Sequence, residues 1–208
     1  MTDISPRPLP PLERAALPPD PIAQFRAWYE AARAAAHGDP DAMALATADA
    51  SGNPSVRMVL LKGFGPEGFA FYTNYGSRKG RELDARPRAA LLFHWPAPHR
   101  QVRIEGAVSR VPAAESDAYW RTRPLASRLS AAASPQSEPI ADRAGLEAAV
   151  RALIDRHPHG GVPRPAGWGG YRVMPDRFEF WQSGLHRLHD RFAYTRTPDG
   201  WRIERLAP

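Results

Sequence analysis

Short strand-like runs that follow one another through tight turns restrict the fold of this chain more than any other feature. Residues 42–48 and 55–62 flank a turn at residues 49–53, and residues 171–181 and 188–196 flank a second turn. Neighbouring runs of this kind pair as antiparallel hairpins. Helical periodicity occurs only at intervals between the runs, and no G-x-G-x-x-G fingerprint is present. The sequence therefore predicts an α+β domain built on an antiparallel, barrel-like sheet of about seven strands with flanking helices.

The chain divides into a short arm and one domain. Residues 1–19 are rich in proline and lack hydrophobic periodicity, which predicts a mobile N-terminal arm. Residues 20–208 contain no linker or repeat, and their length suits one well-formed core. Within this domain the sequence predicts helices over residues 21–36, 112–123 and 139–157. A run of small residues at 126–137 predicts a loop.

The composition excludes several kinds of site and partner. The chain has no cysteine, which removes disulfides, thiolate nucleophiles and zinc–sulfur sites. It has neither an apolar run long enough to span a membrane nor a signal-peptide core at its start, which predicts a cytoplasmic protein. The net charge of +6 is carried by scattered arginines without a block of like charge. A basic patch for small phosphorylated ligands is therefore at least as good an explanation as nucleic acid.

Two separate groups of side chains could bind anions. The first lies at the expected start of a helix, where free backbone N–H groups favour an anion, and comprises Arg57, Ser77, Arg78 and Lys79. The alternative for this group is a routine capped helix with solvated cations. The second group comprises Lys62, Tyr119, Arg123 and Ser127. Its last three members form one stripe if the helix continues past the intervening proline, and a helix end with its cap if it does not. Two such groups predict a phosphorylated cofactor next to a phosphorylated substrate.

The segment of residues 181–191 places Trp181, two histidines, two arginines and an aspartate on a strand, a turn and a second strand. Arginine binds phosphate in a fixed fork and also stacks on rings, so this pattern suits a flat anionic ligand. The alternative is a basic surface hairpin with a core tryptophan. His186 and His189 resemble part of a metal site, but no third ligand is evident, so we expect no bound metal.

Several of these segments resemble the pyridoxamine (pyridoxine) 5′-phosphate oxidase family. The matching runs are Arg57-Met-Val-Leu-Leu-Lys62, Phe71-Tyr-Thr-Asn74, Gly76-Ser-Arg-Lys79, Arg100-Gln101-Val102, Tyr119 through Ser127, Trp181 through Arg191 and Trp201 through Pro208. The resemblance extends from about residue 17 to the C-terminus. It implies an FMN-binding split β-barrel and a homodimer with FMN at the subunit interface. The implied partner is a small phosphorylated pyridine, with neither nucleic acid nor membrane.

The resemblance also implies roles for individual residues. From one subunit, FMN would be bound by Arg57, Met58, Val59, Leu60, Lys62, Tyr72, Thr73, Arg78, Lys79 and Gln101, to which the helix start adds Ser77. From the other subunit, the site would be closed by Gln136, Ser137, Trp181 and Arg191. The substrate phosphate would contact Lys62, Tyr119, Arg123 and Ser127. Arg187 and His189 would lie over the pyridine ring and its 4′ substituent, and Asp39 matches a family aspartate near the reacting carbon.

The implied activity is oxidation of pyridoxamine or pyridoxine 5′-phosphate to pyridoxal 5′-phosphate, with dioxygen as electron acceptor and hydrogen peroxide as product. This chemistry needs a hydride acceptor, which flavin supplies and side chains do not. One departure concerns the family's N-terminal Arg-x-x-Tyr substrate lid, because residues 1–16 contain no tyrosine. Two alternatives stay open: an FMN-dependent oxidase of another substrate, as in phenazine biosynthesis, and a non-catalytic barrel that binds flavin or nucleic acid.

Overall fold

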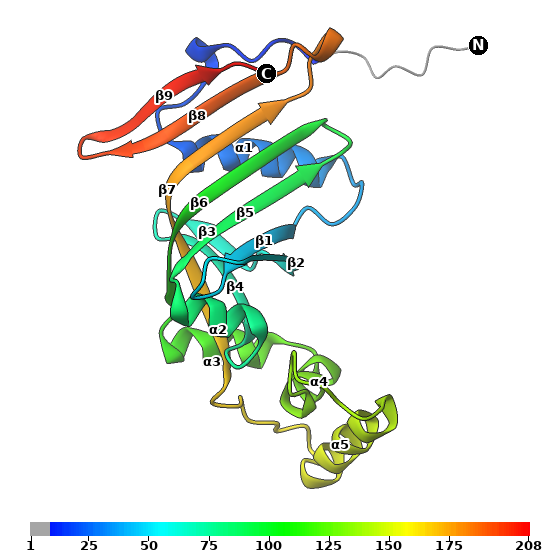
Figure 1. Cartoon of the computed structure of the whole chain (residues 1–208). Coiled ribbons are helices and arrows are strands. Elements are labelled where there is room, and N and C mark those ends of the chain that lie inside the picture. Colours follow the sequence, from blue (N-terminus) through cyan, green and yellow to red (C-terminus); the bar gives the residue numbers. More distant parts are fainter. Residues whose placement is uncertain (1–8) are drawn as a thin grey trace.

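A single curled antiparallel sheet forms the body of the protein (Figure 1). The computed structural model describes residues 9–208. In these residues the strands are β1 (Ala42–Ala48), β2 (Pro54–Leu60), β3 (Gly63–Gly65), β4 (Gly68–Asn74), β5 (Arg88–Trp95), β6 (Arg100–Arg110), β7 (Trp168–Gln182), β8 (Asp190–Thr197) and β9 (Gly200–Leu206). The sheet order is β2-β1-β5-β6-β7-β4-β3, with β8 paired to β7 and β9 to β8. The predicted antiparallel α+β architecture is confirmed, and the short β3 is an addition to it.

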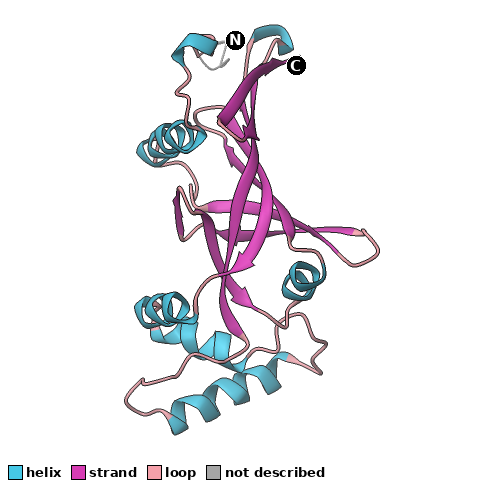
Figure 2. Ribbon diagram, turned by 90° about the vertical axis from the view of Figure 1, so that its left-hand side faces the viewer, coloured by secondary structure: helices cyan, strands magenta, loops and turns pink. Residues whose placement is uncertain are grey.

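The helices cover the sheet unevenly. They are α1 (Pro21–Ala34), α2 (Arg78–Ala85), α3 (Ala113–Thr122), α4 (Leu125–Ala133) and α5 (Arg143–Arg156), with 3-10 turns η1 (Arg14–Ala16) and η2 (Leu185–Arg187). Figures 1 and 2 show α3, α4 and α5 gathered at the end of the molecule away from the β8–β9 hairpin. Within the described residues, no helix has the length and apolar character needed to cross a bilayer.

The segment after α3 corrects the sequence prediction. Most of the predicted loop over residues 126–137 is helical, because α4 runs from Leu125 to Ala133, and only residues 134–137 are irregular. Its alanines and leucines favour a helix, which outweighs the absence of a long apolar face. Arg123 is extended (ψ 143°), as expected of a residue before proline, so α3 ends at Thr122. The predicted stripe is thus divided between two helices.

The helix predicted over residues 139–157 begins later than expected. Asp142 is the N-cap of α5, and its Oδ1 accepts a hydrogen bond of 2.8 Å from the Gly145 backbone N. An aspartate in this place satisfies one of the free N–H groups of the first turn. By contrast, the predicted start of α1 is confirmed: Asp20 accepts from the Ile22 backbone N at 2.9 Å and Pro21 is the first helical residue.

Two apolar clusters position the functional elements. In the larger cluster, Phe25 of α1 is fully buried, and its ring centroid lies 4.9 Å from that of Phe69 on β4 and 5.0 Å from that of Phe93 on β5. The smaller cluster joins α3, α4 and the start of β7 through Trp120, Leu129, Val162 and Trp168. Because aromatic packing of this kind is rigid, β4 and the α3–α4 corner are held in fixed places.

Residues 9–19 run along the β7–β8 end of the sheet. The Leu12 backbone N donates to Asp190 Oδ2 at 2.8 Å, and Gln182 Nε2 donates to the Pro10 carbonyl at 2.9 Å. Leu17 is buried in the core. Residues 1–8 lie outside the described part of the chain, so the mobility predicted for residues 1–19 stays a prediction. The described part of this arm makes defined contacts with the barrel.

Candidate active site

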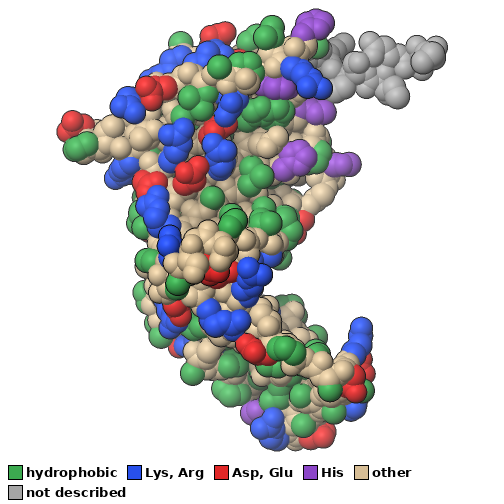
Figure 3. Space-filling model, in the orientation of Figure 1, with side chains coloured by type: hydrophobic (Ala, Val, Ile, Leu, Met, Phe, Trp, Pro, Cys, Tyr) green, Lys and Arg blue, Asp and Glu red, His purple; other side chains and the backbone are tan. Residues whose placement is uncertain are grey.

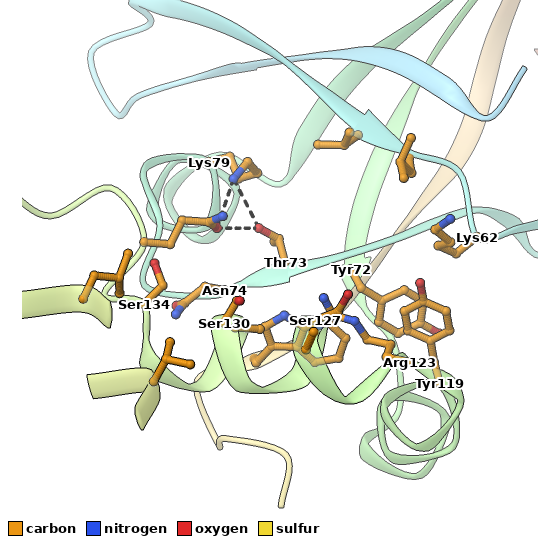
Figure 4. A pocket seen from close by; sticks show the side chains of 18 of the residues that line it. Lys62, Tyr72, Thr73, Asn74, Lys79, Tyr119, Arg123, Ser127, Ser130 and Ser134 are labelled. Atoms are coloured by element: carbon orange, nitrogen blue, oxygen red, sulfur yellow. Dashed lines mark hydrogen bonds between the residues drawn. The ribbon is translucent and has the colours of Figure 1, made fainter. Parts of the chain in front are cut away.

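A cavity of about 1100 Å³ opens between β2, β4, α2 and the helices α3 to α5 (Figure 4). It brings Lys79 of the first anion-binding group together with the whole of the second group. Lys79 enters from α2, while all four members of the second group line the opposite side: Lys62, Tyr119, Arg123 and Ser127. Further predicted cofactor residues also line this cavity, namely Met58, Val59, Leu60, Tyr72, Thr73 and Gln136.

Lys79 is a buried ammonium whose hydrogen-bond partners are all neutral. Its Nζ lies 3.2 Å from Thr73 Oγ1, 3.4 Å from Ser77 Oγ and 3.3 Å from Gln136 Oε1. Burial lowers the pKa of Lys79, the nearby Arg57 guanidinium lowers it further, and Glu82 partly opposes both. A buried charge without a paired anion is costly, so this end of the cavity suits an anionic ligand. Ser77 itself caps α2 by accepting from the Gly80 backbone N at 3.3 Å, as the capped-helix alternative expects.

The structure places Arg57 and Arg78 behind Lys79 rather than in the cavity wall. Both bind the carboxylate of Glu82, Arg57 through Nη2 at 3.1 Å and Arg78 through Nε at 2.8 Å. Glu82 is only 4% exposed and also accepts from Ser55 Oγ at 2.6 Å. Burial raises the pKa of Glu82, but the hydrogen bonds from Ser55, Thr47, Arg78 and Arg57 outweigh it and lower the pKa to about 2. The first group therefore carries two more positive charges than negative ones around Lys79.

Glu82 is a functional candidate that the sequence analysis missed. The only signal was its position one helical turn after Arg78, which is common on any helix surface. Its contacts with Thr47 and Ser55 depend on how the β1–β2 hairpin packs on α2, which no local pattern shows.

Arg123 anchors the second group. Its guanidinium carbon lies 4.6 Å from the ring centroid of Trp168, and its Nη1 is buried without a hydrogen-bond partner among the described residues. Burial lowers the pKa of Arg123. The Tyr119 ring stacks on Tyr72 with centroids 4.0 Å apart, which leaves a flat aromatic wall beside the guanidinium. A buried N–H without a partner costs free energy, and an anionic ligand would satisfy it.

Lys62 lies on the Tyr119 side of the cavity (Figure 4), and its Nζ is 3.9 Å from Asp41 Oδ2. Asp41 in turn accepts a hydrogen bond from the Tyr29 hydroxyl at 2.5 Å. Sequence reasoning selected Asp39 and overlooked Asp41. In the structure Asp39 is exposed in the turn before β1, where its Oδ1 accepts from the Asp41 backbone N at 3.0 Å, and it lines neither cavity described here.

A second cavity, of about 340 Å³, holds most of the predicted residues of the 181–191 segment. Its walls include Gln101, Trp181, His189 and Arg191. Glu179 binds Arg191 through Nε at 2.9 Å and Nη2 at 2.8 Å, so much of the charge of this guanidinium is already neutralised. Arg187 is exposed beside this cavity, in a loop where its φ is 65°.

The two cavities lie at opposite ends of β7 (Trp168–Gln182). Trp168 lines the first cavity and Trp181 the second, and at about 3.3 Å per residue this strand separates them by up to about 40 Å. The two sets of residues therefore cannot surround one small ligand within a single chain.

The two glutamines are also grouped differently from the expected division, which placed Gln101 with Lys79 in one subunit and Gln136 in the other. Gln136 contacts Lys79 of its own chain, whereas Gln101 is paired with Trp181 in the β6–β7 ladder. Ser137 is exposed in the turn after α4 with φ 75° and does not line the first cavity.

The surface between these cavities has two notable properties. On the face that Figure 3 shows, basic side chains are interspersed with acidic ones. Strand β2 ends the main path of the sheet and exposes large apolar side chains: Val56 is 68% exposed and Met58 is 64% exposed. An apolar edge strand of this kind is expected to be covered by another surface.

The curled sheet and its cavity place the chain among the FMN-binding split β-barrels. A solved structure of a "pyridoxamine 5'-phosphate oxidase-related, FMN binding protein" from Nostoc punctiforme PCC 73102 shares this fold. Its TM-score is 0.72 at 18% identity, over 88% of this chain and 97% of that chain. The family described as "Pyridoxamine 5'-phosphate oxidase" matches residues 29–157, and a "Pyridoxine 5'-phosphate oxidase C-terminal dimerisation region" matches residues 168–208. The chain belongs to the pyridoxamine 5′-phosphate oxidase family.

Two further proteins are similar to this chain over nearly its whole length. A "Pyridoxine/pyridoxamine 5'-phosphate oxidase" of Anaeromyxobacter dehalogenans (strain 2CP-C) is 57% identical over 97% of this chain and 100% of its own length. The crystal structure of PhzG from Burkholderia lata 383, in complex with tetrahydrophenazine-1-carboxylic acid, has a TM-score of 0.91. It is 32% identical, over 97% of this chain and 100% of that chain. The resemblance inferred from the sequence motifs is thus confirmed at the level of the family.

Proposed function

We propose that this protein is an FMN-dependent oxidase that converts pyridoxamine or pyridoxine 5′-phosphate to pyridoxal 5′-phosphate, with dioxygen as acceptor and hydrogen peroxide as product. One observation carries the proposal: a single cavity holds two cationic centres, Lys79 and Arg123, that lack a paired carboxylate among the described residues. Two phosphorylated ligands side by side would satisfy both centres.

The Lys79 end fits the phosphate of FMN. The Nζ of Lys79 and the hydroxyl of Thr73 lie together at the first turn of α2, beside the amide of Gln136. The surplus positive charge that Arg57 and Arg78 add around Lys79 matches a phosphate dianion. Strand β2 supplies the apolar wall for the flavin ring through Met58, Val59 and Leu60.

The Arg123 end fits the phosphate of the substrate. Arg123 offers its free Nη1, and the hydroxyls of Tyr119 and Ser127 line the same wall. Lys62 lies on the Tyr119 side of the same cavity and would contact either ligand. This arrangement would fix the pyridine ring next to the flavin, and orientation of this kind contributes several kcal/mol to a reaction between two bound partners.

A second copy of the chain would complete the site. The second cavity carries Gln101, Trp181 and Arg191, and the adjoining loop carries Arg187 and His189. Since β7 separates this set from Lys79 within one chain, the partner's copy would close over the first cavity, with the exposed apolar side chains of β2 buried between them. The dimerisation region matched at residues 168–208 supports a homodimer.

The bound flavin would accept a hydride from the C4′ carbon and pass electrons to dioxygen. The protein residues would do the binding and orienting. Arg187 would clamp the pyridine ring from the partner side, and His189 would bind its substituents. The walls contributed by two chains would exclude water. A cytoplasmic location remains part of this proposal.

A phenazine-type oxidase is the second candidate, favoured by the TM-score of 0.91 to PhzG and by the absence of the Arg-x-x-Tyr lid from the sequence. The first candidate accounts better for Arg123, Lys62 and Ser127, which form a second phosphate site. The test is peroxide release by the purified yellow protein on addition of pyridoxamine 5′-phosphate. Peroxide with this substrate supports the proposal. A yellow protein that releases none, but oxidises a reduced phenazine carboxylate, overturns it.

A further inference from the structure

The loop between β7 and β8 holds His189 in one defined state. The Gly184 backbone N donates a hydrogen bond of 3.2 Å to His189 Nδ1. A backbone N–H can only donate, so Nδ1 must carry the lone pair, and the proton of the neutral imidazole must be on Nε2. A flipped ring would place a C–H group against this amide and lose the hydrogen bond.

The ring has a second contact, with Trp181. His189 lies against Trp181 with centroids 4.7 Å apart and planes inclined by 43°, and both residues line the second cavity. With Nδ1 occupied by the Gly184 amide, Nε2 is the nitrogen that remains for a ligand.

The backbone of this loop is built around the contact. A Cβ atom on Gly184 would lie 1.9 Å from the Leu188 carbonyl oxygen, so only glycine permits the approach. His186 and Arg187 both have positive φ, 54° and 65°, a conformation that non-glycine residues adopt at a cost. Hydrogen bonds inside the loop hold this conformation, from the Leu188 backbone N to the Leu185 carbonyl at 2.9 Å and from the His189 backbone N to the Arg187 carbonyl at 2.9 Å.

Both ends of the loop are also held by the N-terminal segment. Gln182, before the loop, donates to the Pro10 carbonyl, and Asp190, after it, accepts from the Leu12 backbone N. Arg205 joins the same contact by donating to the Leu12 carbonyl at 2.7 Å. Strain that persists because the surroundings fix it is a mark of a functional loop.

We propose that Gly184 is a positioning residue that fixes the Nε2–H tautomer of His189, so that His189 donates a hydrogen bond to an oxygen of the substrate and does not take its proton. The inference rests on the proposed function for the identity of the substrate. It adds the direction of the hydrogen bond: the proton stays on Nε2 while the substrate oxygen accepts.

Nitrogen NMR of the purified flavoprotein, with histidine labelled at both ring nitrogens, reads the tautomer directly and does not depend on turnover. At a pH where His189 is neutral, we expect a protonated Nε2 and an unprotonated Nδ1. A protonated Nδ1, or equal populations of both tautomers, overturns the proposal. Gly184→Ala should release the ring and produce a mixture of tautomers.

A pair of variants tests the role in turnover. Glutamine can place an amide N–H near the position of Nε2, whereas asparagine is too short, and neither can act as a base. We expect His189→Gln to keep kcat/KM within about tenfold of the parent and His189→Asn to lose about a hundredfold, at the low end of the range for a lost acid–base or donor group. Equal losses in both variants would show that proton acceptance is required and overturn the assignment.

His186→Asn is the matched control, since it changes a histidine of the same loop outside both cavities to a residue that tolerates positive φ. If the parent protein itself fails to oxidise pyridoxamine 5′-phosphate, the proposed function falls. The tautomer measured by NMR still decides the inference about Gly184.

Discussion

The two cavities use positive charge in opposite ways. In the larger cavity, Lys79 is buried and Arg123 is half-buried, and neither is paired with a carboxylate among the described residues. Burial lowers the pKa of each. In the smaller cavity, Arg191 and Arg103 share the buried carboxylate of Glu179, which neutralises much of their charge. The difference indicates a division of labour. Under the proposed function, the larger cavity would bind the anionic groups of the ligands, while the smaller one would offer a preassembled surface of rings and hydrogen-bond donors.

Removing Lys79 should have the largest effect on cofactor binding. Lys79→Met takes away the buried ammonium at the proposed phosphate position, and we expect the Kd for FMN to rise at least about a hundredfold, as for loss of one partner of a buried charge pair. Titration of the apoprotein by flavin fluorescence measures this change. Riboflavin, which has no phosphate, is the control ligand, and its weaker binding should be nearly unchanged by the substitution. An equal loss of affinity for FMN and for riboflavin would show that Lys79 does not contact the FMN phosphate.

Arg187→Ala, beside the smaller cavity, should lower turnover more than it lowers cofactor binding. Because the preassembled side orients the substrate, we expect kcat/KM to fall by about a hundredfold. The FMN affinity should change far less. Arg202→Ala, which removes an exposed arginine on β9, is the control. If turnover and FMN affinity fall equally, Arg187 belongs to the cofactor site and not to the substrate site.

Arg123→Met should separate the two ends of the larger cavity. Loss of a charge-assisted contact to the substrate phosphate should raise KM for pyridoxamine 5′-phosphate by about 10- to 100-fold. FMN binding should stay the same. Arg121→Met changes an exposed arginine in the last turn of α3, two residues before Arg123, and should alter neither quantity. A loss of bound FMN in the Arg123 variant alone would contradict two distinct phosphate positions.

Replacing Glu82 should have the smallest effect of these substitutions, and we expect the effect on the stability of the fold. Its pKa is lowered to about 2 in the folded protein, so the carboxylate stabilises the fold above its ordinary pKa of 4.5, and this contribution is lost as the pH falls from there toward 2. Glu82→Gln should lower the free energy of unfolding at pH 7 by on the order of 2 kcal/mol. Urea unfolding at a series of pH values measures this.

The acid dependence separates the charge from the shape of the Glu82 side chain. The variant should lose less stability than the parent between pH 4.5 and 2, because it has no carboxylate to protonate there. Glu147→Gln, at an exposed ion pair on α5, is the control and should match the parent. A parallel acid dependence in parent and Glu82 variant would assign the stability to other groups.

Local sequence patterns predicted the parts of the fold that depend on neighbouring residues. The hairpins and the start of α1 at Asp20 follow from alternation, turn residues and capping, which act over a few positions. The α4 helix could not be predicted in this way, because its alanines and serines form no apolar stripe. Its burial depends on the packing of Leu129 in one cluster with Trp120.

The same limit applies to the candidate site. Lys79 and Arg123 could be selected as anion-binding residues, but their missing partners depend on long-range packing. Several contacts join residues distant in sequence: the strand pairing of Gln101 with Trp181, the ion pair of Arg57 with Glu82 and the contact of Asp41 with Lys62. Most of the residues selected from the motifs line one of the two cavities, and only the structure shows which of them share one.

Complementation between two inactive variants tests most directly whether each site combines the larger cavity of one chain with the smaller cavity of another. Lys79→Met and Arg187→Ala chains are purified separately, then mixed and allowed to exchange. In a mixed dimer, one site carries both substitutions and the other carries none. The account predicts that a 1:1 mixture regains about one quarter of the parental turnover, as expected for random reassortment of a two-fold dimer. Exchange that is complete by mass spectrometry, but restores no turnover, would show that each site is built from a single chain and contradict the account.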